Sequence, residues 1–130
     1  MEKEVMEKLK EIFSKNPAIG LVYFFGSRAR GGGGPLSDYD FAVYFSERDE
    51  KKMFKMKCQL VSAVSRLLKT DGIDVVTLNT TESSELKHQI VSEGKIIFER
   101  EPFRILVEPR ILNEYFDFRA MLRRYGLTKA

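Results

Sequence analysis

Two periodicities of apolar residues divide the chain into expected helices and strands. Apolar residues recur every three or four positions in residues 2–15 and in residues 49–69, which is the spacing of an amphipathic helix. Short runs rich in β-branched and aromatic residues occupy residues 19–25, 38–45 and 73–78. Such runs predict strands, and the first of them is apolar throughout, which is typical of a buried strand.

The second half of the chain predicts a helix, a short strand and a final helix. Ser83 or Ser84 can cap a helix that reaches Glu93, and a strand follows at residues 96–99. An amphipathic pattern then predicts the last helix over residues 109–125. The residues just before this helix show no clear pattern.

This order of elements predicts an α+β fold, a small mixed sheet with the helices packed mainly on one side. Four glycines at residues 31–34 fall in an expected loop at residues 31–36, between the first two strands. We expect a single domain over residues 1–130, with its core in residues 1–99 and a helical tail in residues 100–130.

The composition is that of one ordinary globular domain. Of the 130 residues, 43% are hydrophobic, and ten Phe and five Tyr argue against disorder. No apolar run approaches the roughly 20 residues that a membrane helix needs. Cys58 is the single cysteine, so no internal disulfide can form, and we expect a cytoplasmic protein.

The net charge of +3 lies entirely in the tail. Residues 1–99 hold fifteen basic and fifteen acidic side chains, whereas residues 100–130 hold seven and four. A basic tail can meet an acidic partner or a polyphosphate, although a solvated helix face carries such charges equally well. The tail aromatics Tyr115, Phe116 and Phe118 can pack on their own domain or face a partner.

Candidate chemistry gathers around the first two expected strands. Asp38 and Asp40 lie two positions apart on a strand, so both side chains point to the same face. Carboxylates held that close repel each other and titrate at higher pH than usual. Mg²⁺ commonly takes one or two carboxylates and completes its shell with water and substrate phosphates. The pair therefore predicts a magnesium site.

Gly26 and Ser27 stand where the first strand turns. A glycine lets the backbone approach a ligand, and the following amides and the serine hydroxyl can donate to phosphate oxygens. Arg28 can add a charge-assisted contact. Asp74 lies on the third expected strand, and if it joins the other two aspartates, three carboxylates could hold two metal ions and activate a hydroxyl nucleophile.

Together these residues form a recognisable pattern, in which Gly26-Ser27 is followed after ten residues by Asp38-Tyr39-Asp40. This pattern resembles the signature of the DNA polymerase beta-like nucleotidyltransferase superfamily. The segments FFGSRARG and SDYDFAVYF, in so compact a chain, are similar to its minimal branch, the MNT proteins. The tail at residues 115–118 is similar to that of MntA-type members.

The resemblance implies a polymerase beta-like fold, with ATP as donor and Mg²⁺ as cofactor. It implies that Gly26 and Ser27 hold the triphosphate. It also implies that the metal-binding and catalytic residues are Asp38, Asp40 and Asp74. MntA-type proteins are antitoxins that transfer AMP to a tyrosine of a HEPN-domain RNase toxin. A cognate HEPN toxin is therefore the expected partner. We expect binding neither to a membrane nor to a nucleic acid.

The sequence is also compatible with other functions. The chain can neutralise a toxin by steric cover alone, or transfer a nucleotide to a small molecule such as an aminoglycoside. The intact carboxylates disfavour the first alternative, and the lack of room for a substrate domain disfavours the second. Asp74 can instead cap a turn, and Arg28 and the glycines can be plain loop residues. Self-association through the tail is also compatible with its composition.

Overall fold

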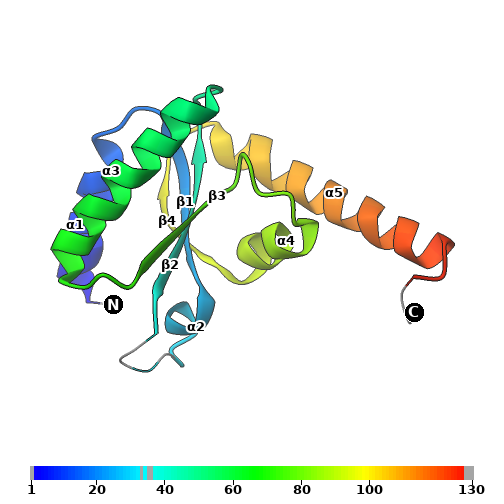
Figure 1. The fold of residues 1–130 in the computed structure, drawn as a ribbon, viewed down its shortest axis with the longest axis horizontal. Coiled ribbons are helices and arrows are strands. Elements are labelled where there is room, and N and C mark those ends of the chain that lie inside the picture. Colours follow the sequence, from blue (N-terminus) through cyan, green and yellow to red (C-terminus); the bar gives the residue numbers. More distant parts are fainter. Residues whose placement is uncertain (1, 33, 35–36, 128–130) are drawn as a thin grey trace.

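The computed structural model describes residues 2–32, 34 and 37–127 of the chain (Figure 1). In chain order the elements are α1 (Lys3–Ser14), β1 (Ile19–Phe25), α2 (Gly26–Ala29), β2 (Tyr39–Phe45), α3 (Glu50–Leu68), β3 (Ile73–Thr77), α4 (Ser84–Glu93), β4 (Lys95–Glu99) and α5 (Phe103–Arg124). Residues 33, 35 and 36 of the expected glycine loop and residues 128–130 of the tail lie outside the described residues.

The strands form one mixed sheet in the order β3-β2-β1-β4. The central strand β1 pairs antiparallel with β2 and β4, whereas β2 and β3 run parallel. Because β1 has a strand on either side and helices over both faces, all of its residues except Phe25 are buried. This burial accounts for its unbroken apolar run. The expected α+β fold with a small mixed sheet is confirmed.

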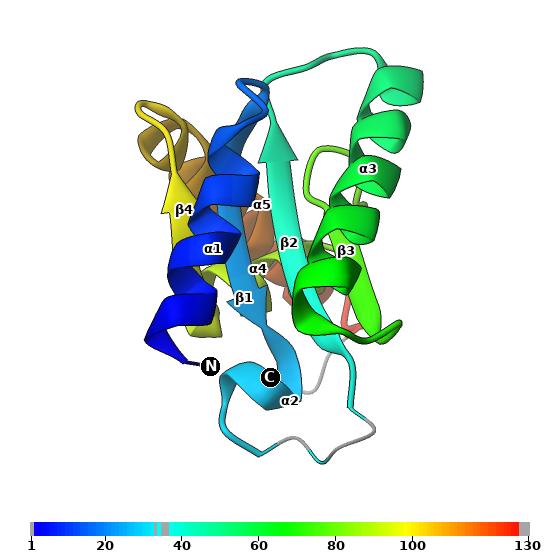
Figure 2. The ribbon, with the colours of Figure 1, turned by 90° about the vertical axis from the view of Figure 1, so that its left-hand side faces the viewer.

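Helices cover both faces of the sheet. Figures 1 and 2 show α1 and α3 on one face and α4 and α5 on the other. The first layer encloses a core that includes Phe13 and Phe41, and the second encloses a core that includes Tyr23 and Ile111. The expectation that the helices pack mainly on one side is therefore wrong. The central strands carry apolar residues on both faces, so each face needs a helical cover.

The last helix is longer than its sequence pattern predicts. It begins at Phe103 rather than at residue 109, and it contains Pro109. A proline has no N–H for the carbonyl four residues earlier, here that of Ile105. Both residues are exposed, so this carbonyl can bind water instead. On the opposite side of the helix Val107 and Ile111 are buried, and their packing stabilises the helix on both sides of the proline.

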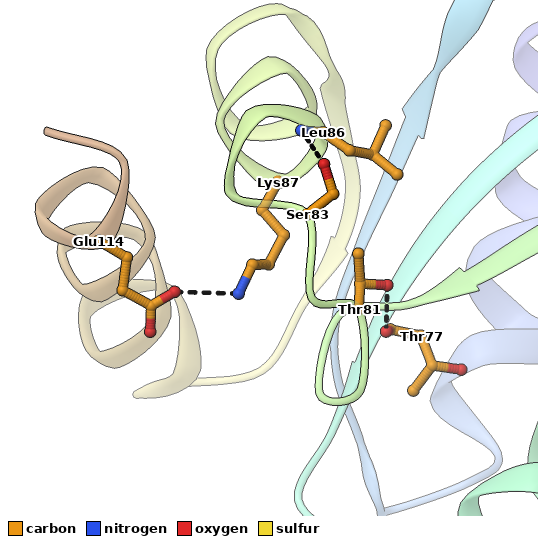
Figure 3. Close-up of polar contacts among 6 residues, drawn as sticks. All are labelled: Thr77, Thr81, Ser83, Leu86, Lys87 and Glu114. Carbon is orange, nitrogen blue, oxygen red and sulfur yellow. Dashed lines mark hydrogen bonds and ion pairs between the residues drawn. The ribbon is translucent and has the colours of Figure 1, made fainter. Parts of the chain in front are cut away.

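The turn between β3 and α4 is held by two hydroxyl groups (Figure 3). The Thr81 hydroxyl donates to the carbonyl of Thr77 at 2.8 Å. The Ser83 hydroxyl accepts from the N–H of Leu86 at 3.1 Å, so Ser83 is the N-cap of α4. A serine cap at this point agrees with the sequence prediction.

Two contacts join α4 to α5. The Lys87 ammonium lies 2.9 Å from a carboxylate oxygen of Glu114, with only 13% of the lysine side chain exposed (Figure 3). The imidazole of His88 stacks on the ring of Tyr115, with 3.8 Å between the centroids. These contacts hold the middle of α5 against the body of the protein. Within the described residues, no helix has the length and apolar character to cross a membrane.

Candidate active site

The three candidate aspartates lie at one end of the sheet, where β2 and β3 begin. Asp40 is the second residue of β2 and pairs in register with Asp74, the second residue of β3. Neighbours in register on parallel strands point to the same face, with the strands about 5 Å apart. Asp38 comes immediately before β2. The two short segments therefore bring all three carboxylates to one corner of the sheet.

The carboxylates of Asp40 and Asp74 point to the face that α4 and α5 cover. Side chains alternate along β2, and Ala42, two residues after Asp40, belongs to the core beneath these helices. On β3, Val76 packs against the same core two residues after Asp74. The aspartates themselves lie beyond the helical cover, since Asp38 and Asp74 are exposed and Asp40 is half-buried. A large substrate can therefore reach them.

The carboxylates act on one another electrostatically. The pKa of Asp40 is raised above its usual value of 3.8, first by burial and then by the negative charges of Asp74 and Asp38. Keeping Asp40 ionised therefore costs free energy in the folded chain. A cation placed among the three carboxylates relieves this cost.

Gly26 brings the end of β1 against Asp40. Its φ of +84° lies in the region that L residues rarely adopt. A Cβ atom built at Gly26 would lie 2.2 Å from Oδ2 of Asp40, which is far inside van der Waals contact. The glycine is thus required both by the backbone turn and by the close approach of the carboxylate.

Ser27 and Arg28 follow in the single turn α2. Both side chains are half-buried, and the Ser27 hydroxyl makes no hydrogen bond with another described residue. The Nε of Arg28 donates to the carbonyl of Ser37 at 2.7 Å, and its guanidinium lies 4.2 Å from the centre of the Tyr39 ring. Arg28 therefore connects the start of the glycine loop to its end, a role that the sequence analysis missed. Tyr39, the aromatic residue between the two aspartates, is the sequence feature that could have indicated this contact with Arg28.

Gly72 is a second residue that the sequence analysis missed. Its carbonyl accepts the N–H of Tyr39 at 2.8 Å, and its own N–H donates to the Thr70 hydroxyl at 3.1 Å. A Cβ atom at Gly72 would lie 3.0 Å from Oδ1 of Asp38. The turn that ends α3 therefore sets the position of Asp38. The sequence shows this glycine only as part of a turn.

The donor atoms at this corner suit a metal that is shared with a substrate. In the parts of the chain that the structure describes, no group of three or more His, Cys, Asp or Glu side chains is arranged to hold a metal ion alone. Carboxylate oxygens are nevertheless the ligands that Mg²⁺ prefers, and this ion commonly takes only one or two of them. The aspartates therefore fit Mg²⁺ that also binds substrate phosphates, rather than a permanent structural ion.

Comparison with solved structures places this geometry in a known fold. A chain of a toxin–antitoxin complex with AMP-PNP is 24% identical and superposes with a TM-score of 0.72, covering 96% of this chain and 95% of the other. A chain from the complex of a tri-AMPylated Shewanella oneidensis HEPN toxin with an MNT antitoxin is 22% identical, with a TM-score of 0.68 and the same coverage of 96% and 95%. At these identities the likeness shows the fold.

Sequence comparison points the same way. The protein adenylyltransferase MntA of Aphanizomenon flos-aquae is 28% identical over 102 residues, which cover 74% of this chain and 67% of that protein. The family described as "Polymerase beta, Nucleotidyltransferase" matches residues 7–103, a span that contains all the candidate site residues. The chain therefore belongs to the polymerase beta nucleotidyltransferase family.

Proposed function

We propose that this chain is a Mg²⁺-dependent protein adenylyltransferase that transfers AMP from ATP to a tyrosine of a cognate HEPN RNase toxin. It thereby acts as the antitoxin of that RNase in the cytoplasm. The observation that carries the proposal is the convergence of Asp38, Asp40 and Asp74 beside Gly26. Family membership and the protein adenylyltransferase among its relatives add support.

In this proposal the three aspartates hold two Mg²⁺ ions together with the triphosphate. When bound, these ions neutralise the charge of the phosphates and orient them for transfer. The raised pKa of Asp40 supports this role, because the repulsion from Asp74 and Asp38 disappears when cations lie between the carboxylates. Keeping the carboxylates ionised costs free energy in the unliganded chain, whereas in the liganded chain the same carboxylates bind the cations.

Gly26 and Ser27 bind the triphosphate. The missing side chain at Gly26 lets phosphate oxygens approach the backbone next to Asp40. The half-buried Ser27 hydroxyl, which has no hydrogen-bond partner among the described residues, donates to a phosphate oxygen. Arg28 adds positive charge beside them, and its stacking on Tyr39 keeps that charge in place.

Asp74 acts as the general base in the transfer step. It accepts the proton of the acceptor tyrosine while the phenolic oxygen forms a bond to the α-phosphorus of ATP. The bond from that phosphorus to the bridging oxygen breaks, and pyrophosphate leaves with the electron pair. The exposed position of Asp74 supports this role, because the hydroxyl arrives on another protein.

The test uses the purified chain, Mg²⁺, ATP labelled at the α-phosphate and the HEPN RNase encoded beside its gene. We expect label on the RNase, and none when Asp38→Asn and Asp40→Asn are combined. Glu7→Gln combined with Glu11→Gln is the matched control, because it removes two charges from exposed positions on α1, which packs on the opposite face of the sheet. Transfer by the double variant would refute the metal assignment. A tight complex without any transfer would favour the steric antitoxin.

A further inference from the structure

The apolar stripe of α5 runs beyond the body of the protein. Val107 and Ile111 are buried, but no later residue of the helix is. The stripe continues at helical spacing through Phe118 and Leu122, which are half-buried, to Tyr125, which is 67% exposed. Figure 1 shows the C-terminal part of α5 projecting away from the sheet and α4. We call residues 116–127 the arm.

The arm also carries most of the net charge of the chain. Residues 1–115 hold eighteen basic and eighteen acidic side chains, whereas the arm holds three arginines and one aspartate. Arg119 and Arg123 lie four positions apart and therefore share one edge of the helix. Neither arginine forms an ion pair with another described residue. Apolar side chains bordered by unneutralised cations fit an acidic, partly apolar protein surface.

A second copy of the chain fits this surface poorly. Two arms packed antiparallel along their stripes would place Arg119 of one copy near Arg123 of the other, and these like charges repel. A nucleic acid would neutralise the arginines but offers little to the aliphatic side chains of Leu122 and Met121. A protein that combines carboxylates with apolar residues satisfies both parts of the arm.

The arm lies on the active-site side of the sheet. α5 packs against the same core as Ala42 and Val76, and Asp40 and Asp74 point to this face. Figure 1 shows α4 and α5 together on this side, opposite α1 and α3. A protein held by the arm is therefore on the side from which the carboxylates can be reached.

We propose that the arm is the docking surface for the protein acceptor. The acceptor contributes an apolar segment that packs on Phe118, Leu122 and Tyr125, and carboxylates that pair with Arg119 and Arg123. This inference rests on the proposed function and names the surface by which the acceptor is selected. Docking on the arm raises the local concentration of the acceptor hydroxyl near the aspartates.

Two arm variants test the inference independently. One combines Arg119→Glu with Arg123→Glu, and the other combines Leu122→Ser with Tyr125→Ser. The matched controls are Lys51→Glu with Lys55→Glu, two exposed cations four positions apart on α3, and Ile105→Ser, which is 76% exposed near the start of α5. The readouts are the Kd for the HEPN RNase encoded beside the gene, the KM of that RNase in AMP transfer, and the Kd for Mg²⁺-ATP.

We expect both arm variants to raise the Kd and KM for the RNase about tenfold or more, with Mg²⁺-ATP binding unchanged. The controls should leave all three values unchanged. The charge-reversal variant alters only the edge of the helix, so it keeps the test valid if the apolar variant unfolds. Because the pairing is electrostatic, its effect should also shrink as salt is raised.

Other outcomes would overturn the inference. An unchanged Kd and KM in both arm variants, with transfer still occurring, would remove the arm from acceptor binding and leave the proposed function intact. If the wild-type chain binds the RNase without transferring AMP, and the arm variants lose that binding, the arm proposal stands and the proposed function fails. Loss of dimerisation, or of binding to a labelled single-stranded RNA, with an unchanged Kd for the RNase, would assign the arm to those partners instead.

Discussion

Gly26 and Asp40 approach so closely across the β1–β2 pair that no side chain fits between them. A Cβ atom at Gly26 would lie 2.2 Å from Oδ2 of Asp40, and the φ of Gly26 is +84°. The backbone turn that follows β1 and the carboxylate of Asp40, the second residue of β2, therefore form one unit. Any change at Gly26 must move either the turn or the carboxylate.

Gly26→Ala should abolish most activity through this contact. The positive φ alone costs an alanine about 1 kcal/mol, and the clash then displaces Asp40. A displacement of about 1 Å at a reacting group can lower the rate about 100-fold. AMP transfer and urea unfolding of the same preparation would measure the two effects.

Gly31→Ala is the matched control for that change. The φ of Gly31 is +78°, but a Cβ atom there meets nothing within 4 Å. Gly31→Ala should therefore lose only the roughly 1 kcal/mol that the positive φ costs, and it should retain its transfer rate. An equal loss of activity in both variants would show that the backbone conformation, and not the contact with Asp40, is what matters.

Asp40→Asn should make the ligand-free protein more stable at neutral pH. The pKa of Asp40 is raised in the folded chain, so protonation of this group favours folding. That contribution is fully present below the usual pKa of 3.8 and is lost as the pH rises through the higher folded pKa. Asparagine carries no charge, so the Asp40→Asn chain does not lose this stability as the pH rises. Urea unfolding across this pH range, without metal, should show the advantage of Asn appearing as the pH rises.

The same urea unfolding should be repeated in the presence of Mg²⁺ and a non-hydrolysable ATP analogue. The metal and the analogue should stabilise the wild-type chain and have little effect on Asp40→Asn, because the variant lacks a metal-binding carboxylate. If Asp40→Asn were less stable at neutral pH, Asp40 would be making a stabilising contact, which the proposed electrostatic account does not contain.

Tyr23→Phe should loosen the attachment of α5 to the sheet. The Tyr23 side chain is fully buried, and its hydroxyl donates to a carboxylate oxygen of Glu108 at 2.5 Å. Burial and the hydrogen bond to Glu108 raise the pKa of the phenol, so it remains a donor. Loss of a hydrogen bond to a charged group should lower the free energy of unfolding by about 2 kcal/mol. Tyr44→Phe is the control, since the Tyr44 hydroxyl bonds to no described residue.

Lys87→Met should have a smaller effect on the junction between α4 and α5. The Lys87 ammonium is largely covered and lies 2.9 Å from Glu114, so its removal should cost about 1 kcal/mol in urea unfolding. Lys52→Met removes a pair at 3.9 Å in which the lysine side chain is 68% exposed, and it should change nothing measurable. Similar losses from both variants would mean that the covered pair has no special role.

Much of the fold could be predicted because its signals are local. The apolar runs of β1, β2 and β3 and the periodic stripe of α3 mark these elements within about one residue of their ends. The start of α5 could not be predicted, because Pro109 interrupts the local pattern and tertiary packing of Val107 and Ile111 overrides it. The distribution of helices over both faces is likewise a tertiary property.

The candidate site, too, could be predicted only where its signals are local in the sequence. The spacing of Asp38 and Asp40 already places their side chains on one face, and a family motif adds Gly26 and Ser27. The pairing of Asp40 with Asp74 depends on the register between β2 and β3, which no local signal gives. The support that Gly72 gives to Asp38 depends on the same pairing and was missed for that reason.

The intact mass of the HEPN RNase after incubation with this chain, Mg²⁺ and ATP tests AMP transfer directly. We expect one or more added AMP groups that peptide mapping locates on tyrosine. We expect no addition when Asp38→Asn and Asp40→Asn are combined in the chain or when the metal is chelated. An unmodified RNase in a stable complex with the wild-type chain, or modification that survives the double change, would contradict these expectations.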